Sequence, residues 1–266
     1  MIPSPPAARL RRAALVGVLC AGLALTATGC GEDPDKGTNG VGKLAPEKIE
    51  AEARTAASAA SAVRLSGTVV TAGKSFTLDM RLKADGGSGK VQSSGSSFEL
   101  LRVGDQLYLK ADAAFWEHGA PGEEAGGGSG TPSGAPGGED GDDSAADKLG
   151  GKFVKVPEGD PAYKQLRGFT DKKTLLDGLL GLHGKLEKGA YRKIGTVRTV
   201  ELKVDGGTGG RLDVSLIGTP YPLRLERAGG AGTVELADWG RPFTLAPPPE
   251  DQTVDYGSQL PTGSSS

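Results

Sequence analysis

The sequence predicts an α+β protein in which one β-sheet is accompanied by two helices. Residues 76–82 alternate strictly between apolar and polar side chains, as a strand with one buried face does. Two other stretches, 46–63 and 170–188, place apolar residues at helical spacing instead. Strand candidates separated by short turns fill the sequence between and after these stretches. The first half is therefore expected to be a helix followed by a meander.

The N-terminal stretch has the three-part layout of an export signal. A basic start (Arg9, Arg11, Arg12) is followed by the apolar run 13–25 and by the tetrad Ala-Thr-Gly-Cys that ends at Cys30. Lipoprotein signal peptidase reads this pattern and leaves the cysteine as a lipidated first residue. We therefore expect a signal peptide, 1–29, and a mature protein held by its lipid at the extracytoplasmic face of the cell membrane.

This stretch has three other interpretations. The apolar run is too short for a transmembrane helix, which needs about 20 apolar residues. A secretory signal cut at another position stays an alternative, whereas a twin-arginine signal is disfavoured because Arg11 and Arg12 lead straight into alanines.

Composition and charge exclude several classes of function. Cys20 is removed with the signal, so the mature chain has no cysteine pair for a disulfide or a metal cluster. The two histidines, His118 and His183, argue against a His-rich metal site. Loss of the three signal arginines changes the net charge from −2 to −5, which argues against binding of nucleic acid by a basic surface. We expect no metal, cofactor or nucleic-acid partner.

The mature chain is expected to begin with a flexible tether, 30–45, because this stretch has almost no apolar side chains. A flexible chain of this length spans about 20 Å on average. Pro46 then suits the first position of a helix over 46–63. The apolar stripe of this helix is narrow and consists of Ile49, Ala53, Ala56, Ala60 and Val63.

The next strands are predicted at 65–70, 76–82, 98–103, 106–110 and 152–156. Two similar glycine-rich stretches, 82–90 and 202–211, each separate two strand candidates. Asp-Gly-Gly favours a hairpin that needs positive φ. A phosphate-binding loop is the other interpretation, and it is disfavoured because no helix pattern follows the first stretch.

Residues 119–147 interrupt the domain. They include ten glycines and seven acidic residues but no Lys or Arg. Such a segment cannot bury enough apolar surface to offset its ordering entropy, so it is predicted to be a disordered acidic insert. Its acidic cluster lacks the ligand spacing of an EF-hand.

The second helix is expected at 170–188, with Thr170 as its N-cap and Gly189 at its end. Its apolar stripe consists of Leu175, Leu179, Leu182 and Leu186, widened by Leu176 and Leu180. Three glycines within it weaken the helix by up to about 1 kcal/mol each. It is either an ordinary core helix or a movable cover over a cavity. His183 beside the stripe is expected to be a capping or surface residue.

The remaining strands are predicted at 196–204, 211–217, 223–227, 233–237 and 242–245. Arg198 is expected at the rim of the sheet, and Trp239 in a turn that places it against the sheet edge. The polar tail, 247–266, is predicted to be disordered, which leaves a single domain over 46–246. Motifs of serine hydrolases and zinc proteases are absent from the sequence, so we expect no enzymatic activity.

Short stretches spread over the folded region carry a family resemblance. They are GDQLYLK at 104–110, KFVKVP at 152–157, LLDGLL at 175–180, PLRLER at 222–227 and VELADWGRPFTLAPP at 234–248, in addition to Cys30 and the helix at 46–63. With these the chain resembles the LppX/LprA/LprF/LprG family of actinobacterial cell-envelope lipoproteins, whose fold is LolA-like. The acidic insert departs from the family pattern.

The resemblance implies a curved antiparallel sheet, a half-barrel, whose concave face is covered by helices over an apolar cavity. It also implies binding, and transfer through the envelope, of acylated lipids or glycolipids. Few aromatics and small Ala-rich contacts are compatible with an underfilled interior of this kind. The candidate cavity residues are Phe76, Leu78, Met80 and Leu100 on strands and Leu175, Leu179, Leu182 and Leu186 on the covering helix. The alternative is a non-catalytic scaffold or chaperone-like module, and in either role we expect a monomer.

Overall fold

The computed structural model describes residues 35–71, 73–93, 96–112, 115–116, 149–255 and 257. Contacts divide the chain into two units, and all described residues lie in the second, Pro34–Ser266. The predicted signal peptide with Cys30 and the predicted acidic insert, 119–147, lie outside the described residues. Within the described ranges, no helix is long and apolar enough to cross a membrane.

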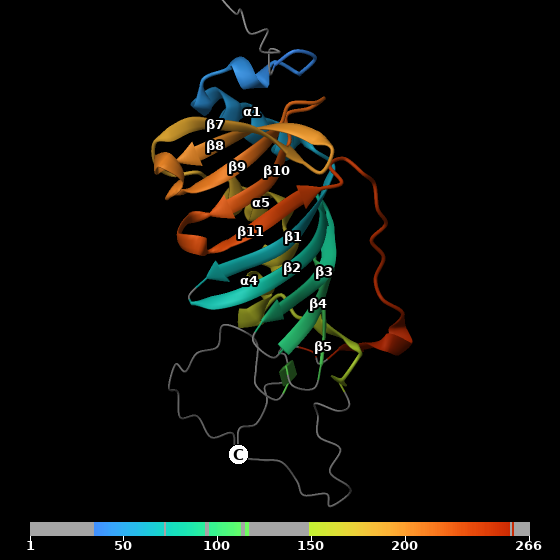
Figure 1. Cartoon of the computed structure of the whole chain (residues 1–266). Coiled ribbons are helices and arrows are strands. Elements are labelled where there is room, and N and C mark those ends of the chain that lie inside the picture. The colour runs from blue at the N-terminus through green and yellow to red at the C-terminus, as the bar shows by residue number, and fades with distance from the viewer. Residues whose placement is uncertain are drawn as a thin grey trace, which may run out of the picture. The chain divides into compact units, whose positions relative to one another are not determined.

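One sheet contains all twelve of the strands in these ranges (Figure 1). In order of pairing they are β12 (Thr253–Asp255), β6 (Phe153–Val156), β5 (Gln106–Ala111), β4 (Ser96–Val103), β3 (Gly86–Ser93), β2 (Lys74–Lys83), β1 (Ala62–Thr71), β11 (Gly232–Ala237), β10 (Pro222–Arg227), β9 (Gly210–Ser215), β8 (Val197–Val204) and β7 (Leu186–Ile194). Neighbours are antiparallel except β12 and β6, which are parallel.

The sheet is open, since its order ends at β12 on one side and at β7 on the other. Strand direction changes progressively between β7 and β5 in Figure 1, so the sheet is curved. The predicted fold class, α+β with a curved and mainly antiparallel sheet, is therefore confirmed.

The alternating pattern that predicted a strand at 76–82 sets the two faces of β2. Burial alternates residue by residue along this strand. Its apolar side chains, Phe76, Leu78, Met80 and Leu82, are buried. On the adjacent β3, a side chain at Gly89 would place its Cβ 2.1 Å from the Asp79 carbonyl oxygen, so only glycine allows this approach. The stretches 82–90 and 202–211 both contain hairpin connections, β2–β3 and β8–β9, as predicted.

Helices α1 (Pro46–Ala59), α4 (Pro161–Thr170) and α5 (Lys172–Leu180) form the helical layer. Helix α4 contacts β2, β3 and β4, α1 contacts β7 and β10, and α5 contacts both other helices. Figure 1 shows α4 and α5 behind the central strands. The buried face of α1 is Ile49, Ala53, Ala56 and Ala57, small side chains that allow close packing. The hydrophobic core lies between this layer and the sheet.

The first helix ends earlier than the predicted 46–63. Helix α1 stops at Ala59, and Ala60 is extended at φ −62° and ψ 133°. Val63 is buried on β1, where it pairs with Leu82 of β2. Pairing between two strands therefore overrides the helical spacing of the last two apolar residues.

The predicted helix 170–188 is wrong at both ends. Thr170 is the last residue of α4, and Asp171 is the N-cap of α5, with φ −95° and ψ 108°. The helix stops at Leu180 because Gly181 leaves helical geometry. Residues 186–194 then form β7 on β8, so the Leu182 and Leu186 positions are not helical.

Helix α4 was missed in the sequence, although its start carries a recognisable signal. Asp160 accepts a hydrogen bond from the Ala162 N–H at 2.7 Å, and Pro161 occupies the first helical position. This Asp-Pro pair is a typical helix start. The prediction of a strand at 242–245 is wrong, because these residues form no regular secondary structure.

Both ends of the domain are more ordered than predicted. Residues 35–45, assigned above to a flexible tether, include the 3-10 turn η1 (Val41–Lys43) and the buried Val41. The tail predicted to be disordered from 247 contains η4 (Glu250–Gln252) and β12, whose backbone pairs with β6. Both corrections arise from contacts with strands far away in the sequence.

Candidate functional site

The four candidate residues on strands all lie in the core beneath the helical layer. Met80 and Leu100 are fully buried, and Leu78 and Phe76 are 3% and 8% exposed. They belong to the same hydrophobic cluster as the buried leucines of α5. The sequence therefore identified the apolar face of the sheet correctly.

The four leucines predicted on the covering helix do not share one helical face. Leu179 is buried on α5, and Leu175 on the same helix is only partly buried. Leu182 follows the helix and packs partly against the core, and Leu186 lies half-buried on β7. The buried face of α5 is formed by Leu179 with Leu176 and Leu180, the two residues expected to widen the stripe.

A buried arginine connects the sheet to the junction between α4 and α5. Arg102 of β4 is 3% exposed. Its Nε donates to Thr170 Oγ1 at 3.1 Å and its Nη2 to the Thr170 carbonyl oxygen at 3.0 Å. Its Nη1 donates to the Gly104 carbonyl oxygen at 2.8 Å, and the Asp171 carboxylate lies 3.9 Å away. One side chain thus holds the end of α4, the start of α5 and the β4–β5 turn.

The Asp171 carboxylate lies between two groups that favour its charged form, the Thr174 N–H and the Arg102 guanidinium. Its carboxylate accepts a hydrogen bond from the Thr174 N–H at 2.8 Å, which caps α5. Burial opposes its ionisation, but the hydrogen bonds from Thr174 and the positive charge of Arg102 outweigh this effect and lower the pKa of Asp171. The carboxylate therefore remains charged where the positive end of the helix dipole also favours it.

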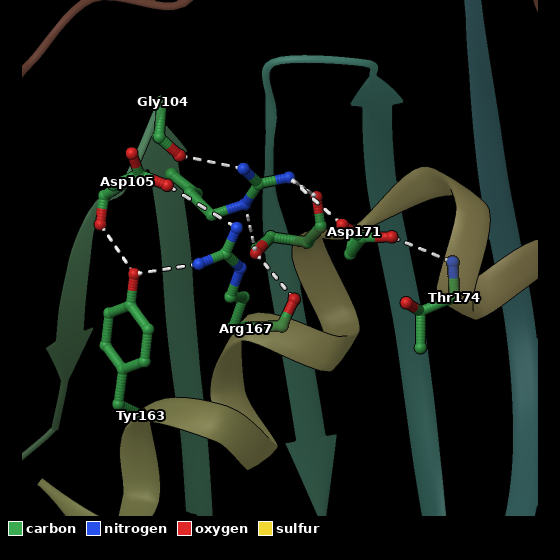
Figure 2. A network of polar contacts seen from close by, with 8 residues as sticks. Gly104, Asp105, Tyr163, Arg167, Asp171 and Thr174 are labelled. Carbon is green, nitrogen blue, oxygen red and sulfur yellow. Dashed lines mark hydrogen bonds and ion pairs between the residues drawn. The ribbon is translucent and has the colours of Figure 1, made fainter. Parts of the chain in front are cut away.

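Helix α4 is also tied to the β4–β5 turn through two of its own side chains, the buried Tyr163 and the more exposed Arg167. Tyr163 Oη donates to the Asp105 carbonyl oxygen at 2.7 Å. Arg167 Nη2 lies 3.5 Å from the Asp105 carboxylate and its guanidinium lies above the Tyr163 ring. Figure 2 shows Tyr163 and Arg167 beside Asp105, with Asp171 and Thr174 at the start of α5. The whole set fixes one end of the helical layer to one turn of the sheet.

Lys172 makes the equivalent connection between α5 and α1. Its Nζ donates to the Ser58 carbonyl oxygen at 3.0 Å and also to the Ala60 carbonyl oxygen. These carbonyls belong to the last turn of α1, where a cation is favourable. Burial lowers the pKa of Lys172. The start of α5 is therefore bonded both to the sheet and to α1.

A pocket opens between α1 and α5. Its apolar wall is formed by Ala57, Leu176 and Leu180, and its mouth is polar (Arg54, Ser58, Lys172, Lys173, Asp177). Its volume is about 40 Å³, whereas pockets for small-molecule ligands have about 300–1,000 Å³. In this conformation the pocket has room for water molecules but not for a small-molecule ligand or an acyl chain.

An aromatic cluster lies in the core near the end of β5. The ring of Phe115 is 5.3 Å from that of Phe98 and 5.2 Å from that of Trp116. Trp116 is 5% exposed, and its Nε1 has no hydrogen-bond partner among the described residues. An unsatisfied buried donor costs about 1–3 kcal/mol.

The opposite face of the sheet carries charge. Glu201 of β8 is fully buried, and its carboxylate lies 2.7 Å from Arg192, 3.5 Å from Arg211 and 3.7 Å from Lys203. Beside it, Asp213 of β9 accepts from Thr199 Oγ1 at 3.2 Å, and burial raises its pKa. These groups are engaged with their neighbours along the strands. Among the described residues, no cluster of His, Cys, Asp or Glu is arranged to hold a metal ion.

Other expectations concern single residues. His183 is exposed and its Nδ1 lies 2.8 Å from the Gly181 carbonyl oxygen, in agreement with a capping or surface role. Arg198 donates to the carbonyl oxygens of Lys36 and Gly37. Arg102, Lys172 and Trp116 were missed as functional candidates. An arginine among apolar residues on a strand is the one signal that could have identified Arg102.

Neither a protein-family model nor a curated protein sequence matches the chain. Solved structures that are similar to it include the following three. LprF from Mycobacterium bovis has 17% identity and a TM-score of 0.46, and the match covers 77% of this chain and 98% of that one. The Mycobacterium tuberculosis lipoprotein LppX has 12% identity and a TM-score of 0.39, with 76% and 100% covered. A LolA superfamily protein from Nitrosomonas europaea has 9% identity and a TM-score of 0.21, with 78% and 96% covered. LprF and LppX are members of the family that the sequence resembles.

Proposed function

We propose that the protein is a membrane-anchored lipoprotein that binds the acyl chains of lipids or glycolipids between its sheet and helices and passes them on within the cell envelope. It acts without catalysis, at the extracytoplasmic face of the membrane. The observation that carries this proposal is the construction of the cover. Helix α5 buries three leucines in the same hydrophobic core as the apolar face of the sheet. Its polar ties to other elements are concentrated at its first residues.

An acyl chain needs more room than the α1–α5 pocket offers, so binding requires α5 to move. Exposing its three buried leucines costs about 5–9 kcal/mol at 1.5–3 kcal/mol for each. Burial of a 16-carbon chain contributes about 12 kcal/mol at 0.8 kcal/mol for each methylene. A long acyl chain therefore offsets the displacement, and a short one does not.

Trp116 supports an ester-bearing ligand. Its buried Nε1 donor lies in the apolar core without a partner among the described residues. The carbonyl oxygen of an acyl ester would accept this hydrogen bond and remove the cost of the unsatisfied donor.

The test is native mass spectrometry of a Cys30→Ala protein purified from an actinobacterial host, with uptake of a fluorescent fatty-acid ester. We expect a co-purifying lipid and saturable uptake that a palmitoyl ester competes away. A protein that carries no lipid and takes up no probe would contradict the proposal.

The variant Trp116→Phe sharpens this test because it removes the indole N–H donor and keeps an aromatic ring in the core. We expect the ester probe to bind about 5- to 10-fold more weakly, and a hydrocarbon probe without an ester to bind equally well. Phenylalanine is smaller than tryptophan, so some loss of unfolding free energy is expected, and the unchanged binding of the hydrocarbon probe separates the lost hydrogen bond from lost packing.

Anchoring through Cys30 is tested separately. Labelled palmitate should be incorporated into the wild-type protein in cells and not into Cys30→Ala, and the variant should leave the membrane fraction. Incorporation at another residue, or none, would contradict the anchor and leave lipid binding unaffected.

The small volume of the α1–α5 pocket favours a second candidate, a non-catalytic scaffold or chaperone-like module of the envelope. In that case cross-linking in cells should capture a defined partner while the purified protein carries no lipid. A partner that persists after deletion of residues 119–147 would contact the folded domain and not the acidic insert.

A further inference from the structure

The segment that leads into α1 is bound to one end of the sheet. Asn39 Nδ2 donates to the carbonyl oxygens of Ser215 and Gly218 at 3.0 and 2.9 Å, across the end of β9. Tyr191 Oη on β7 donates to the Asp35 carboxylate at 2.9 Å. The segment also accepts hydrogen bonds from two cations, Lys188 to the Gly42 carbonyl and Arg198 to the Lys36 and Gly37 carbonyls. Residues 35–44 therefore form part of the folded surface beside β7, β8 and β9.

This docking shortens the reach between the domain and its predicted anchor. Asp35 is held at the sheet end, and Cys30 precedes it by only five residues. Five residues span at most about 18 Å when fully extended. A lipid on Cys30 therefore keeps this end of the domain within about 18 Å of the bilayer.

The same end carries the exposed apolar side chains. Among the described residues, the large hydrophobic side chains that are exposed are Leu44, Tyr191 and Ile217, at 38%, 38% and 47%. Leu44 follows η1, and Tyr191 Oη lies 3.3 Å from the Gly42 carbonyl oxygen within that turn. Ile217 lies between Ser215 and Gly218, the two residues whose carbonyls bind Asn39. Three separate segments thus bring apolar side chains to one end of the sheet.

Basic side chains accompany them. Lys36, Lys43 and Lys193 are exposed. Lys193 lies opposite Arg198 in the β7–β8 register, and the Arg198 side chain donates to the carbonyl oxygens of residues 36 and 37. Exposed apolar and aromatic groups flanked by lysines are typical of surfaces that rest on anionic membranes. We call Lys36, Lys43, Leu44, Tyr191, Lys193 and Ile217 the η1 patch.

We propose that the η1 patch contacts the surface of a membrane with anionic headgroups and fixes the orientation of the domain on it. The inference extends the proposed function. It rests on attachment through Cys30 only where the distance between the domain and the bilayer is argued. The occupant is the lipid surface itself: the anchor reaches no farther, the lysines complement anionic headgroups, and the apolar tips enter the interface.

The first experiment uses the mature chain with Cys30→Ser and sedimentation with vesicles of phosphatidylcholine and phosphatidylglycerol at 7:3. We expect binding that falls about 25-fold in Lys36→Gln/Lys193→Gln, since each lysine near an anionic surface contributes about fivefold. Ile217→Asn should also weaken binding, and vesicles of phosphatidylcholine alone should bind poorly.

The matched control is Lys90→Gln/Lys164→Gln, which removes the same charge from exposed lysines of β3 and α4 in the other half of the sheet. We expect this variant to bind like the parent protein. Equal losses of binding in both double variants would indicate a general charge effect and overturn the proposal. No loss in either variant would overturn it as well, because the patch would then make no membrane contact.

The second experiment uses the intact acylated protein in the same vesicles. Cys30 is the sole cysteine of the mature chain and its sulfur is acylated, so Ile217→Cys and Lys164→Cys each give one site for a fluorophore. Nitroxide lipids should quench the label at 217 several-fold more than that at 164, and equal quenching would overturn the orientation. The mass of the N-terminal peptide reports acylation independently, so a missing anchor is distinguished from a wrong contact surface.

Discussion

Replacing Arg102 with Met removes its hydrogen bonds while keeping much of its buried volume. Arg102 is 3% exposed and donates to three acceptors, two on Thr170 and one on Gly104. Methionine can fill the space of the stem. Methionine leaves the carbonyl oxygens of Thr170 and Gly104 without the hydrogen bonds that Arg102 donates.

The magnitude follows from burial and from the charge of the donor. Hydrogen bonds to a charged group contribute about 1.5–3 kcal/mol each, and breaking a buried charged contact on one side costs about 3–5 kcal/mol. Thr170 Oγ1 keeps its own bond to the Arg167 carbonyl, so its loss is smaller. We therefore expect the unfolding free energy to fall by about 3–5 kcal/mol.

Urea denaturation followed by circular dichroism measures this loss, with Arg64→Met as the matched control. Arg64 makes a bidentate contact with Asp79 at 2.9 and 2.7 Å, shorter than most bonds of Arg102. Both partners are exposed, at 39% and 52%, so solvent screening limits their contribution to about 1 kcal/mol.

A loss at Arg102→Met no larger than that at Arg64→Met would refute the reasoning that burial, and not bond length, sets the contribution. Hydrogen exchange adds a local readout. The amides of residues 168–176 should exchange faster in Arg102→Met, because the junction loses its tie to the sheet. Unchanged exchange there would show that the α4–α5 junction does not depend on Arg102.

Three further substitutions have distinct outcomes. Burial raises the pKa of Asp213, so the folded protein keeps a proton that the unfolded chain releases, and stability should fall as pH rises from the ordinary value of 3.8 through the raised value. Asp213→Asn should abolish this fall, measured as the urea midpoint against pH. Trp239→Ala should lower the unfolding free energy by about 2–3 kcal/mol, because Trp239 stacks on Tyr221 at 4.8 Å and donates to a backbone carbonyl. Glu201→Gln should cost about 2 kcal/mol by the same assay, since the surrounding cations lose their counter-charge but stay partly solvated.

The strands were predictable where one short stretch contains all the information. In β2 the alternation of four apolar side chains specifies both the strand and its buried face. The turn Gly104-Asp105 similarly separates β4 from β5. Nothing distant in the sequence is required for either assignment.

The helix boundaries were not predictable to the residue. Thr170 and Asp171 are adjacent, and both are good N-caps. Arg102 decides between them, because it binds the Thr170 carbonyl as the end of α4 and leaves Asp171 to cap α5. This choice depends on a residue 68 positions away.

The ordered N-terminal segment and β12 were missed for the same reason. Asn39 binds carbonyls 176 and 179 residues later, and β12 pairs with β6 about 100 residues before it. Local composition in both stretches is polar and resembles that of a linker. Of the candidate leucines, periodicity identified the buried Leu179 but wrongly placed Leu182 and Leu186 on the same helix. Arg102 and Lys172 escaped prediction because they bind backbone carbonyls, which every residue possesses.

The polar ties also predict how the cover moves. Asp171 caps the first turn of α5 at Thr174 and faces Arg102 of the sheet, and Lys172 binds the end of α1. From Lys173 to Gly184 the polar side-chain contacts that the structure describes are local, between Lys173 and Asp177 and between His183 and Gly181. Apolar contacts tolerate exchange of one hydrocarbon for another, whereas hydrogen bonds to fixed carbonyls are directional. An acyl chain that replaces the α5 leucines would therefore enter from the Gly181 end, with the Asp171 end as the hinge.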